Sequence, residues 1–138
     1  MVTIVKEWDT GALMNLYRAG GWWKEEWDPV EIPRLVRSTF AFVVAVDRTT
    51  KETVGMGRAI SDGVSDAYIQ DLVVLPAFRG RGIGRAILEK LVDVCRQRGI
   101  TWIALVAEPG TADFYRCSGF EPMEGHVPMH YRGKEGVC

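Results

Sequence analysis

The sequence predicts a mixed α+β fold, in which a mixed, mostly antiparallel sheet of about six to seven strands is flanked by about four helices. Three apolar segments, residues 40–46, 53–60 and 67–75, are joined by short polar turns, which favours antiparallel neighbours. An amphipathic segment follows the third, and residues 101–107 then form another apolar run. A helix in that place returns the next strand parallel to the previous one. The expected order is β-α-α-β-β-β-α-β-α-β-β.

The N-terminal elements are a short strand and two helices. Residues 3–5 are apolar and indicate the strand. Asp9 or Thr10 can cap a helix that ends at the glycine pair 20–21, and residues 32–38 predict a second helix.

A tryptophan-rich connector joins these helices. Tryptophan rings are costly to leave in water, so the rings cover either the core edge or a ligand. Both interpretations stay open. Carboxylates beside aromatic faces would favour a cationic amine. The residues concerned are Trp22, Trp23, Trp27, Glu26 and Glu31.

A glycine-rich turn carries the clearest functional signal. It lies between a strand that stops at Pro76 and an amphipathic helix that Gly99 can end. The first turn of a helix has backbone N–H groups without partners, and glycines let several of them approach one ligand. Arginines add full positive charge, so a polyphosphate is the expected ligand. The turn consists of Arg79, Gly80, Arg81, Gly82, Ile83 and Gly84, with Arg85 next.

Competing glycine motifs do not fit. The dinucleotide fingerprint G-x-G-x-x-G requires glycine where Arg85 or Ile87 stands, and the P-loop requires a Lys-Ser or Lys-Thr pair that is absent. A turn that binds nothing, with glycines only for tight packing, is the remaining alternative.

Two sequence blocks resemble a known family. VVLPAFRGRGIGRAILEKL is similar to the acetyl-CoA-binding signature of the GNAT superfamily of N-acetyltransferases, with Arg79, Gly82 and Gly84 at the signature positions. Residues 114–120, FYRCSGF, resemble the later F-Y-x-x-x-G-F element of that superfamily. The predicted order of elements fits over nearly the whole chain.

The resemblance implies acetyl-CoA as co-substrate. Backbone groups of Leu72, Val73 and Val74 would hold the pantetheine arm, and the turn at residues 79–84 would hold the pyrophosphate. The strands beginning near residues 67 and 101 would splay apart and leave that edge open. An amine would attack the acetyl group directly in a ternary complex.

Tyr115 matches the general-acid tyrosine of the family. An ordinary tyrosine pKa of about 10 keeps the hydroxyl protonated at neutral pH, as a thiolate leaving group requires. An aromatic core residue is the alternative. A ping-pong path through Cys117 is less favoured, because only Arg116 adjoins it to lower its pKa. Residues 108–110, Glu-Pro-Gly, replace an Asn that often contacts the cofactor in relatives.

The sequence leaves two alternatives for the general base. Many relatives carry a Glu on the strand before the signature, but Gln70 stands at the matching position and cannot take a proton. Asp71 is the candidate base, although strand alternation sends it to the opposite face unless the strand bulges. The alternative is a water relay to Glu31, Asp62 or His130.

The resemblance also implies that the tryptophan connector lines the acceptor pocket. We expect a small cationic primary amine, with a peptide N-terminus or a lysine as alternatives. Fold-level resemblance does not identify the acceptor. A homodimer is compatible with the sequence.

Composition limits the remaining classes. An apolar content of 47% suffices for a single domain over residues 1–138, and a net charge of −1 gives no case for nucleic acid or membrane. Without a membrane-length apolar run or a signal-peptide pattern, we expect a cytoplasmic protein. Three cysteines lack C-x-x-C spacing and only two histidines occur, so we expect neither disulfide nor metal.

The C-terminal part predicts a short helix from Thr111 or Ala112 to Cys117, an irregular hairpin from Phe120, and a frayed tail at residues 132–138. Two rival functions remain. One is a sensor that holds acyl-CoA without turnover, favoured by Gln70. The other is a different CoA- or nucleotide-dependent enzyme.

Overall fold

The computed structural model describes residues 1–133. The last part of the expected frayed tail, including Cys138, lies outside the described residues. The chain divides into two compact units, Met1–Leu105 and Val106–Cys138.

The first unit contains a five-stranded sheet. Its strands are β1 (Val2–Val5), β2 (Ala41–Val46), β3 (Thr53–Ser61), β4 (Asp66–Val74) and β5 (Trp102–Leu105). They lie side by side in chain order, antiparallel except for the parallel pair of β4 and β5. Both the antiparallel run and the parallel return are as predicted from turn lengths.

The helices of this unit also match the sequence pattern. They are α1 (Thr10–Ala19), α2 (Glu31–Ser38) and α3 (Ile83–Gln97), with a 3₁₀ turn, η1, at Pro76–Phe78. Asp9 caps α1, since its carboxylate accepts a hydrogen bond from the Ala12 N–H at 2.8 Å. Gly99, at a φ of 81°, follows the end of α3.

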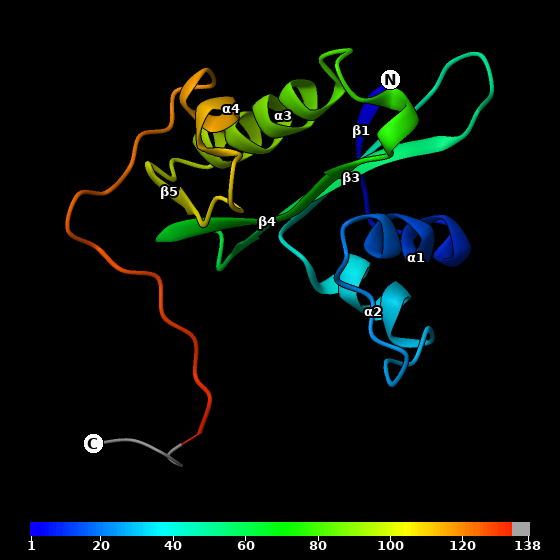
Figure 1. The fold of residues 1–138 in the computed structure, drawn as a ribbon, viewed down its shortest axis with the longest axis horizontal. Coiled ribbons are helices and arrows are strands. Elements are labelled where there is room, and N and C mark those ends of the chain that lie inside the picture. Colours follow the sequence, from blue (N-terminus) through cyan, green and yellow to red (C-terminus); the bar gives the residue numbers. More distant parts are fainter. Residues whose placement is uncertain (134–138) are drawn as a thin grey trace. The chain divides into compact units, whose positions relative to one another are not determined.

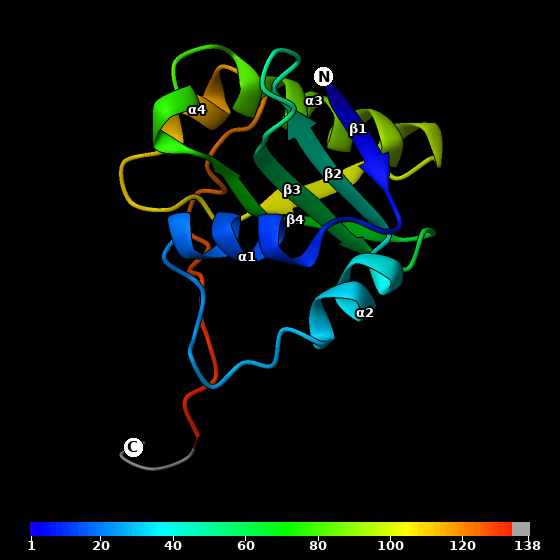
Figure 2. The same cartoon turned by 90° about the vertical axis from the view of Figure 1, so that its right-hand side faces the viewer.

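The helices cover both faces of the sheet. In Figures 1 and 2, α1 and α2 lie on one face and α3 lies on the other. The apolar faces of the helices pack on the strands, so the core has two layers. Its largest fully buried side chains are Phe42, Leu13, Leu16, Met56, Ile87, Leu88, Leu91, Ile100, Val36, Val43, Val44 and Val54.

Gly57 of β3 brings α3 close to the sheet. A Cβ built at this glycine would lie 2.9 Å from Ile87 and 3.1 Å from Leu91, both on α3. Residue 57 therefore faces α3, and the next residue, Arg58, faces the α1 side.

In the described part of the second unit, the helix is α4 (Ala112–Arg116). Gly119, at a φ of 94°, reverses the chain after it, and the Phe120 N–H donates to the Tyr115 carbonyl at 3.1 Å. This helix lies where the sequence pattern predicts it.

The expected hairpin after Phe120 was wrong for the described residues. Residues 120–133 contain no strand, so the sheet has five strands rather than six to seven. Pro122 and Pro128 cannot donate ladder hydrogen bonds, and Gly125 and Gly133 have positive φ. These residues interrupt a regular ladder.

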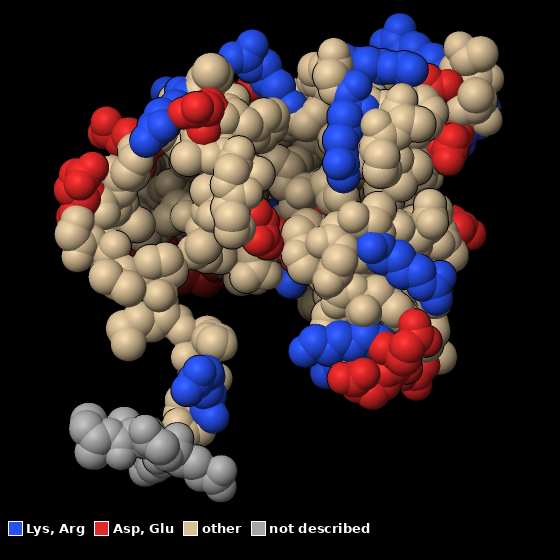
Figure 3. All heavy atoms as spheres, in the orientation of Figure 1, with Lys and Arg blue, Asp and Glu red and all other residues tan. Residues whose placement is uncertain are grey.

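Three further findings concern the described part of the chain. No helix there has the length and apolar character needed to cross a bilayer. Residues 1–133 contain no group of three or more potential metal-binding side chains. On the face drawn in Figure 3, basic and acidic side chains are interspersed.

Candidate active site

The turn between β4 and α3 has the open backbone that the sequence suggested. Gly80 and Gly82 have φ values of 78° and 79°, in the left-handed region that favours glycine. A Cβ at either position would meet nothing within 4 Å. Glycine is therefore required here by backbone conformation, and the surrounding space stays open.

The amides of this turn are largely available. The Arg79 N–H donates to the Pro76 carbonyl at 3.3 Å, and the Ala86 N–H donates to the Gly82 carbonyl at 3.0 Å. Within residues 1–133, the N–H groups of residues 80–84 donate to no protein acceptor. Together with the positive end of the α3 dipole, they suit the diphosphate of a nucleotide cofactor.

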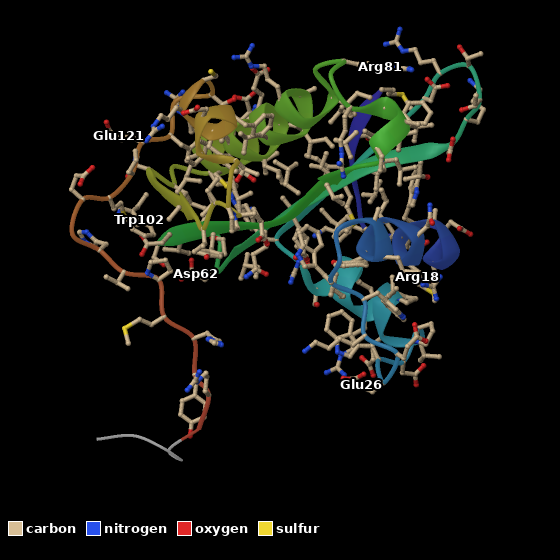
Figure 4. All side chains as sticks on the ribbon, in the orientation of Figure 1. Arg18, Glu26, Asp62, Arg81, Trp102 and Glu121 are labelled. Carbon is tan, nitrogen blue, oxygen red and sulfur yellow. The ribbon has the colours of Figure 1, made fainter. Side chains whose placement is uncertain are left out.

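The turn's arginines rest on the protein's own backbone. Arg79 Nε donates to the Val74 carbonyl at 3.0 Å. Arg81, labelled in Figure 4, lies with Nη2 3.5 Å from the Ala77 carbonyl and with its guanidinium 5.0 Å from the Phe78 ring centroid. Such solvent-exposed contacts are weak and can be exchanged for stronger phosphate contacts.

The edge of β4 next to this turn is unpaired on one side. The parallel pairing with β5 covers Asp66 to Ile69 only, where Ile69 faces Leu105. No strand of the described residues continues that pairing along residues 70–74. The backbone of Leu72, Val73 and Val74 thus has the open edge that the splayed strands were expected to leave; its cofactor role stays a prediction.

A β-bulge interrupts β4 directly after this pairing. Val73 pairs with Met56 and Gln70 pairs with Arg58, so two residues of β4 lie opposite Gly57. The first of them is Asp71, whose φ of 58° is left-handed. By strand alternation alone, Asp71 would lie on the opposite face from Gln70; the bulge places both residues on the same face.

The side chains around this bulge form a polar cluster, which we call the Asp71 network: Tyr17, Arg58, Gln70 and Asp71. Arg58 Nε donates to Asp71 Oδ2 at 2.7 Å, and the Tyr17 hydroxyl donates to the same oxygen at 2.8 Å. Arg58 Nη2 donates to Gln70 Oε1 at 3.2 Å. The Arg58 and Asp71 side chains are only 17% and 18% exposed, so this ion pair is well shielded from water.

Burial and the adjacent Asp71 charge raise the pKa of Tyr17 above its ordinary value. Its hydroxyl therefore remains a donor across the neutral range. Sequence reasoning missed both Tyr17 and Arg58, which are 54 and 13 residues from Asp71. The available signal was a lone arginine within the apolar strand 53–61, since a shielded charge needs a partner.

The base candidates are already engaged by other groups. Asp71 accepts two hydrogen bonds at Oδ2, and Glu31 pairs with Arg34 at 3.4 Å. Asp62 accepts from the Val64 and Ser65 N–H groups at 2.8 Å, and these bonds, the Ser65 bond first, lower its pKa. His130 lies in the second unit. The assignment of Asp71 as base stays a prediction.

The three tryptophans of the connector make different contacts. Trp22 packs edge-on against Tyr17 at a centroid distance of 6.3 Å, and Trp23 packs edge-on against Trp27 at 5.7 Å. Protein cations already lie over two of the rings: Arg18 over Trp23 and Lys24 over Trp27. Figure 4 shows Arg18 and Glu26 in this region, far from Arg81 within the same unit.

Tyr115 lies on α4 in the second unit. Its ring contacts Phe114 and Phe120 edge-on, at centroid distances of 5.0 and 6.2 Å. Burial, followed by the negative charge of Glu108, raises the pKa of Tyr115 above its ordinary value. The hydroxyl is therefore protonated throughout the neutral range, as a general acid requires. Cys95 is buried, and burial raises the pKa of its thiol, whereas Cys117 is exposed.

Known proteins match this chain by sequence and by fold. Serotonin N-acetyltransferase 2, chloroplastic, from Oryza sativa subsp. japonica is 48% identical over 86 residues, which are 61% of this chain. The chain spans only 43% of the rice protein's length.

Two solved structures share the fold of this chain. A GNAT family protein from Streptococcus pneumoniae TIGR4 matches 98% of this chain and 100% of its own, with a TM-score of 0.80 and 26% identity. Rv2747 from Mycobacterium tuberculosis, solved in complex with CoA, matches 92% of this chain and 76% of its own, with a TM-score of 0.68 and 21% identity.

The family profile described as "Acetyltransferase (GNAT) family" matches residues 5–120, which include both the glycine turn and the block at residues 114–120. That match spans most of the chain. The chain belongs to the GNAT family of acetyltransferases.

Proposed function

We propose that this chain is a single acetyltransferase domain that moves the acetyl group of acetyl-CoA to a primary amine. The observation that carries the proposal is the turn at residues 80–84, whose amides have no protein acceptor within residues 1–133 and whose glycines leave open space. Family membership and the rice relative support it.

The donor site combines three kinds of group. The amides of residues 80–84 and the side chains of Arg79 and Arg81 bind the diphosphate. The open β4 edge at Leu72, Val73 and Val74 hydrogen-bonds the amide-bearing pantetheine arm. Rv2747, which shares the fold, was solved in complex with CoA, and this supports the choice of donor.

The reaction is direct attack in a ternary complex. Acetyl-CoA supplies a thioester, at which the C–N bond to the amine forms and the C–S bond breaks. Tyr115, the general acid by family resemblance, gives its proton to the leaving sulfur and regains one from solvent. The amine loses its protons to a base, for which Asp71 remains the candidate.

The acceptor is proposed to be a small cationic amine. Glu26, in the connector that contains the exposed Trp27, and Glu31, at the start of α2, are acidic residues, and the rice relative is named for serotonin, itself an amine. A peptide N-terminus or a lysine side chain is the alternative substrate. Cytoplasmic location and homodimer formation stay predictions; the rice relative is named as chloroplastic.

A sensor that binds acyl-CoA without turnover is the second candidate. It is favoured by Gln70, which cannot take a proton and whose Oε1 accepts from Arg58. Thiol release in the presence of amines separates the two functions.

The test combines binding and turnover. Isothermal titration should show acetyl-CoA binding, and a panel of arylalkylamines, polyamines and peptides should show amine-dependent release of free thiol. Tyr115→Phe should keep donor affinity and lower kcat by about 10²-fold or more, because the thiolate then lacks its proton donor. Tyr131→Phe, an exposed tyrosine in the same unit, is the matched control.

Each failure has a separate meaning. No acetyl-CoA binding would overturn the donor assignment. Binding without thiol release for any amine would favour the sensor. A Tyr115→Phe variant with unchanged kcat would remove Tyr115 from the acid role.

A further inference from the structure

We propose that Tyr17 and Arg58 are positioning residues: they hold Asp71 in its left-handed conformation and so keep the bulged β4 edge in the shape that binds the acetyl-CoA donor. Asp71 then contributes to donor binding through its backbone and its contacts, separately from the base role proposed for its carboxylate. The inference rests on the proposed function and specifies how the donor site is maintained.

Asp71 has an unusual backbone for its place in the fold. It is one of two non-glycine residues with positive φ among residues 1–133; the other is Lys51, in the turn between β2 and β3. A left-handed residue is readily accommodated in a turn, but Asp71 lies within a strand. Such a conformation persists only where the surroundings stabilise it.

The Asp71 network supplies that stabilisation from two elements. Arg58 extends from β3, in the middle of the sheet, and its Nε donates to Asp71 Oδ2 at 2.7 Å. Tyr17 extends from α1 and donates to the same oxygen at 2.8 Å. Two fixed donors that converge on one oxygen define the position of the carboxylate and therefore of its backbone.

Arg58 is itself held in place. Its Nη2 donates to Gln70, the residue directly across the ladder, and its Nη1 lies 3.5 Å from the Thr39 hydroxyl. A guanidinium with several fixed contacts is preorganised, so its side chain loses little further conformational freedom when it binds Asp71. The neighbouring Trp22 packs on the Tyr17 ring and limits its motion.

The bulge determines which β4 atoms are available after it. Pairing with β5 ends at Ile69, the bulge follows, and Leu72 to Val74 come next. Without the extra residue, the register after the bulge would shift by one, and each following side chain would move to the other face of the sheet. Leu72 now contacts the α3 side, and Val73 is buried, so the shift would also disturb the core.

Substitutions of Asp71 separate positioning from proton transfer. Asp71→Asn keeps a short polar side chain that tolerates the left-handed region, and Asp71→Gly removes the contacts and the strain together. Both should bind acetyl-CoA within about threefold of the wild type, whatever their kcat. Asp71→Ala keeps the strain without the contacts, and should weaken donor affinity by roughly tenfold.

The role of Arg58 is tested by making the same substitution in the wild type and in the Asp71→Gly variant. Arg58→Met should weaken donor affinity by roughly tenfold in the wild type and have little further effect in Asp71→Gly. A glycine at position 71 adopts the left-handed conformation without stabilising contacts. Tyr17→Phe should act in the same direction with a smaller effect. Tyr131→Phe and Asp93→Asn, both at exposed positions, are matched controls.

Hydrogen exchange of the amides of residues 70–74 gives a readout that does not depend on activity. Exchange should be faster in Asp71→Ala and Arg58→Met than in the wild type, and close to the wild type in Asp71→Gly. Unfolding measurements identify conditions in which every variant is folded, and exchange is compared under those conditions.

The outcomes distinguish the two proposals. If Asp71→Asn and Asp71→Gly weaken donor affinity as much as Asp71→Ala does, the loss does not come from backbone strain, and the inference is overturned. A lower kcat at unchanged donor affinity supports the inference and assigns the base role to the Asp71 carboxylate as well. Equal exchange in all variants would also overturn it. If the wild type binds no acetyl-CoA, the proposed function fails, and the exchange pattern still decides whether Tyr17 and Arg58 hold the bulge.

Discussion

At the scale of single residues, charge and burial tune the groups assigned to chemistry. The pKa of Tyr115 is raised first by burial and then by Glu108. The acid form of a tyrosine is needed when the sulfur leaves, so kcat should fall only above that raised pKa. The effect of Glu108 on this pKa can be separated from that of burial, because a neutral substitution at residue 108 removes only the charge.

Glu108→Gln should move the alkaline limb of kcat to lower pH. A carboxylate disfavours the tyrosinate, so its removal lowers the pKa of Tyr115. The pH dependence of kcat, together with ultraviolet titration of Tyr115, measures the shift. Glu121→Gln, an exposed glutamate in the same unit, is the control. A profile identical to that of the wild type would contradict the proposed coupling.

Gly82→Ala tests the backbone of the turn. Gly82 is left-handed at a φ of 79°, so alanine should destabilise the fold by about 1–2 kcal/mol and weaken acetyl-CoA binding. Gly99→Ala is the matched variant, since Gly99 has a φ of 81° at the other end of α3 and a Cβ there also meets nothing within 4 Å. It should lose stability but keep donor affinity. Equal losses of affinity in both would argue against a specific role for the turn.

At the scale of elements, α3 and β3 fix the position of the turn and the bulge. Helix α3 packs directly over Gly55 and Gly57, where an added Cβ would lie 2.9 Å from Ile87 in each case. The close approach holds the N-terminus of α3 against the end of β4. The same Gly57 is the single residue opposite the bulge.

Gly57→Ala should therefore destabilise the protein by about 1–3 kcal/mol, through crowding between α3 and the sheet. Denaturant unfolding measures the change. Gly11→Ala is the control: Gly11 lies on an exposed part of α1, where alanine should stabilise the helix by about 0.5–1 kcal/mol. A neutral Gly57→Ala would mean that α3 can move away from the sheet at little cost.

At the scale of the whole molecule, ligand binding should be visible as stability. A donor present at about 100 times its dissociation constant adds about 2.7 kcal/mol, or roughly 5–10 °C in Tm for a chain of this size. Thermal unfolding with acetyl-CoA should show this increase, and NAD, whose fingerprint is absent, should not. An equal increase with NAD would favour a general nucleotide site.

Patterns within the sequence predicted most of the elements. Period-2 and period-3.6 patterns and turn residues such as Gly20 and Gly99 placed the strands and helices of residues 1–133 close to their observed bounds. These signals are local, because capping and amphipathic burial depend on residues a few positions apart. The hairpin expected after Phe120 was wrong, because Pro122 and Pro128 outweighed the apolar residues around them.

The sequence by itself determined the family, through two sequence blocks. It also determined the order of elements and the glycine turn, since both depend on neighbours in the chain. Only the tertiary structure decided that Asp71 is left-handed and lies between Tyr17 and Arg58. Those contacts join residues from α1, β3 and β4. Partners so distant in the chain meet only when helix and sheet pack together, and no local pattern records which of them will meet.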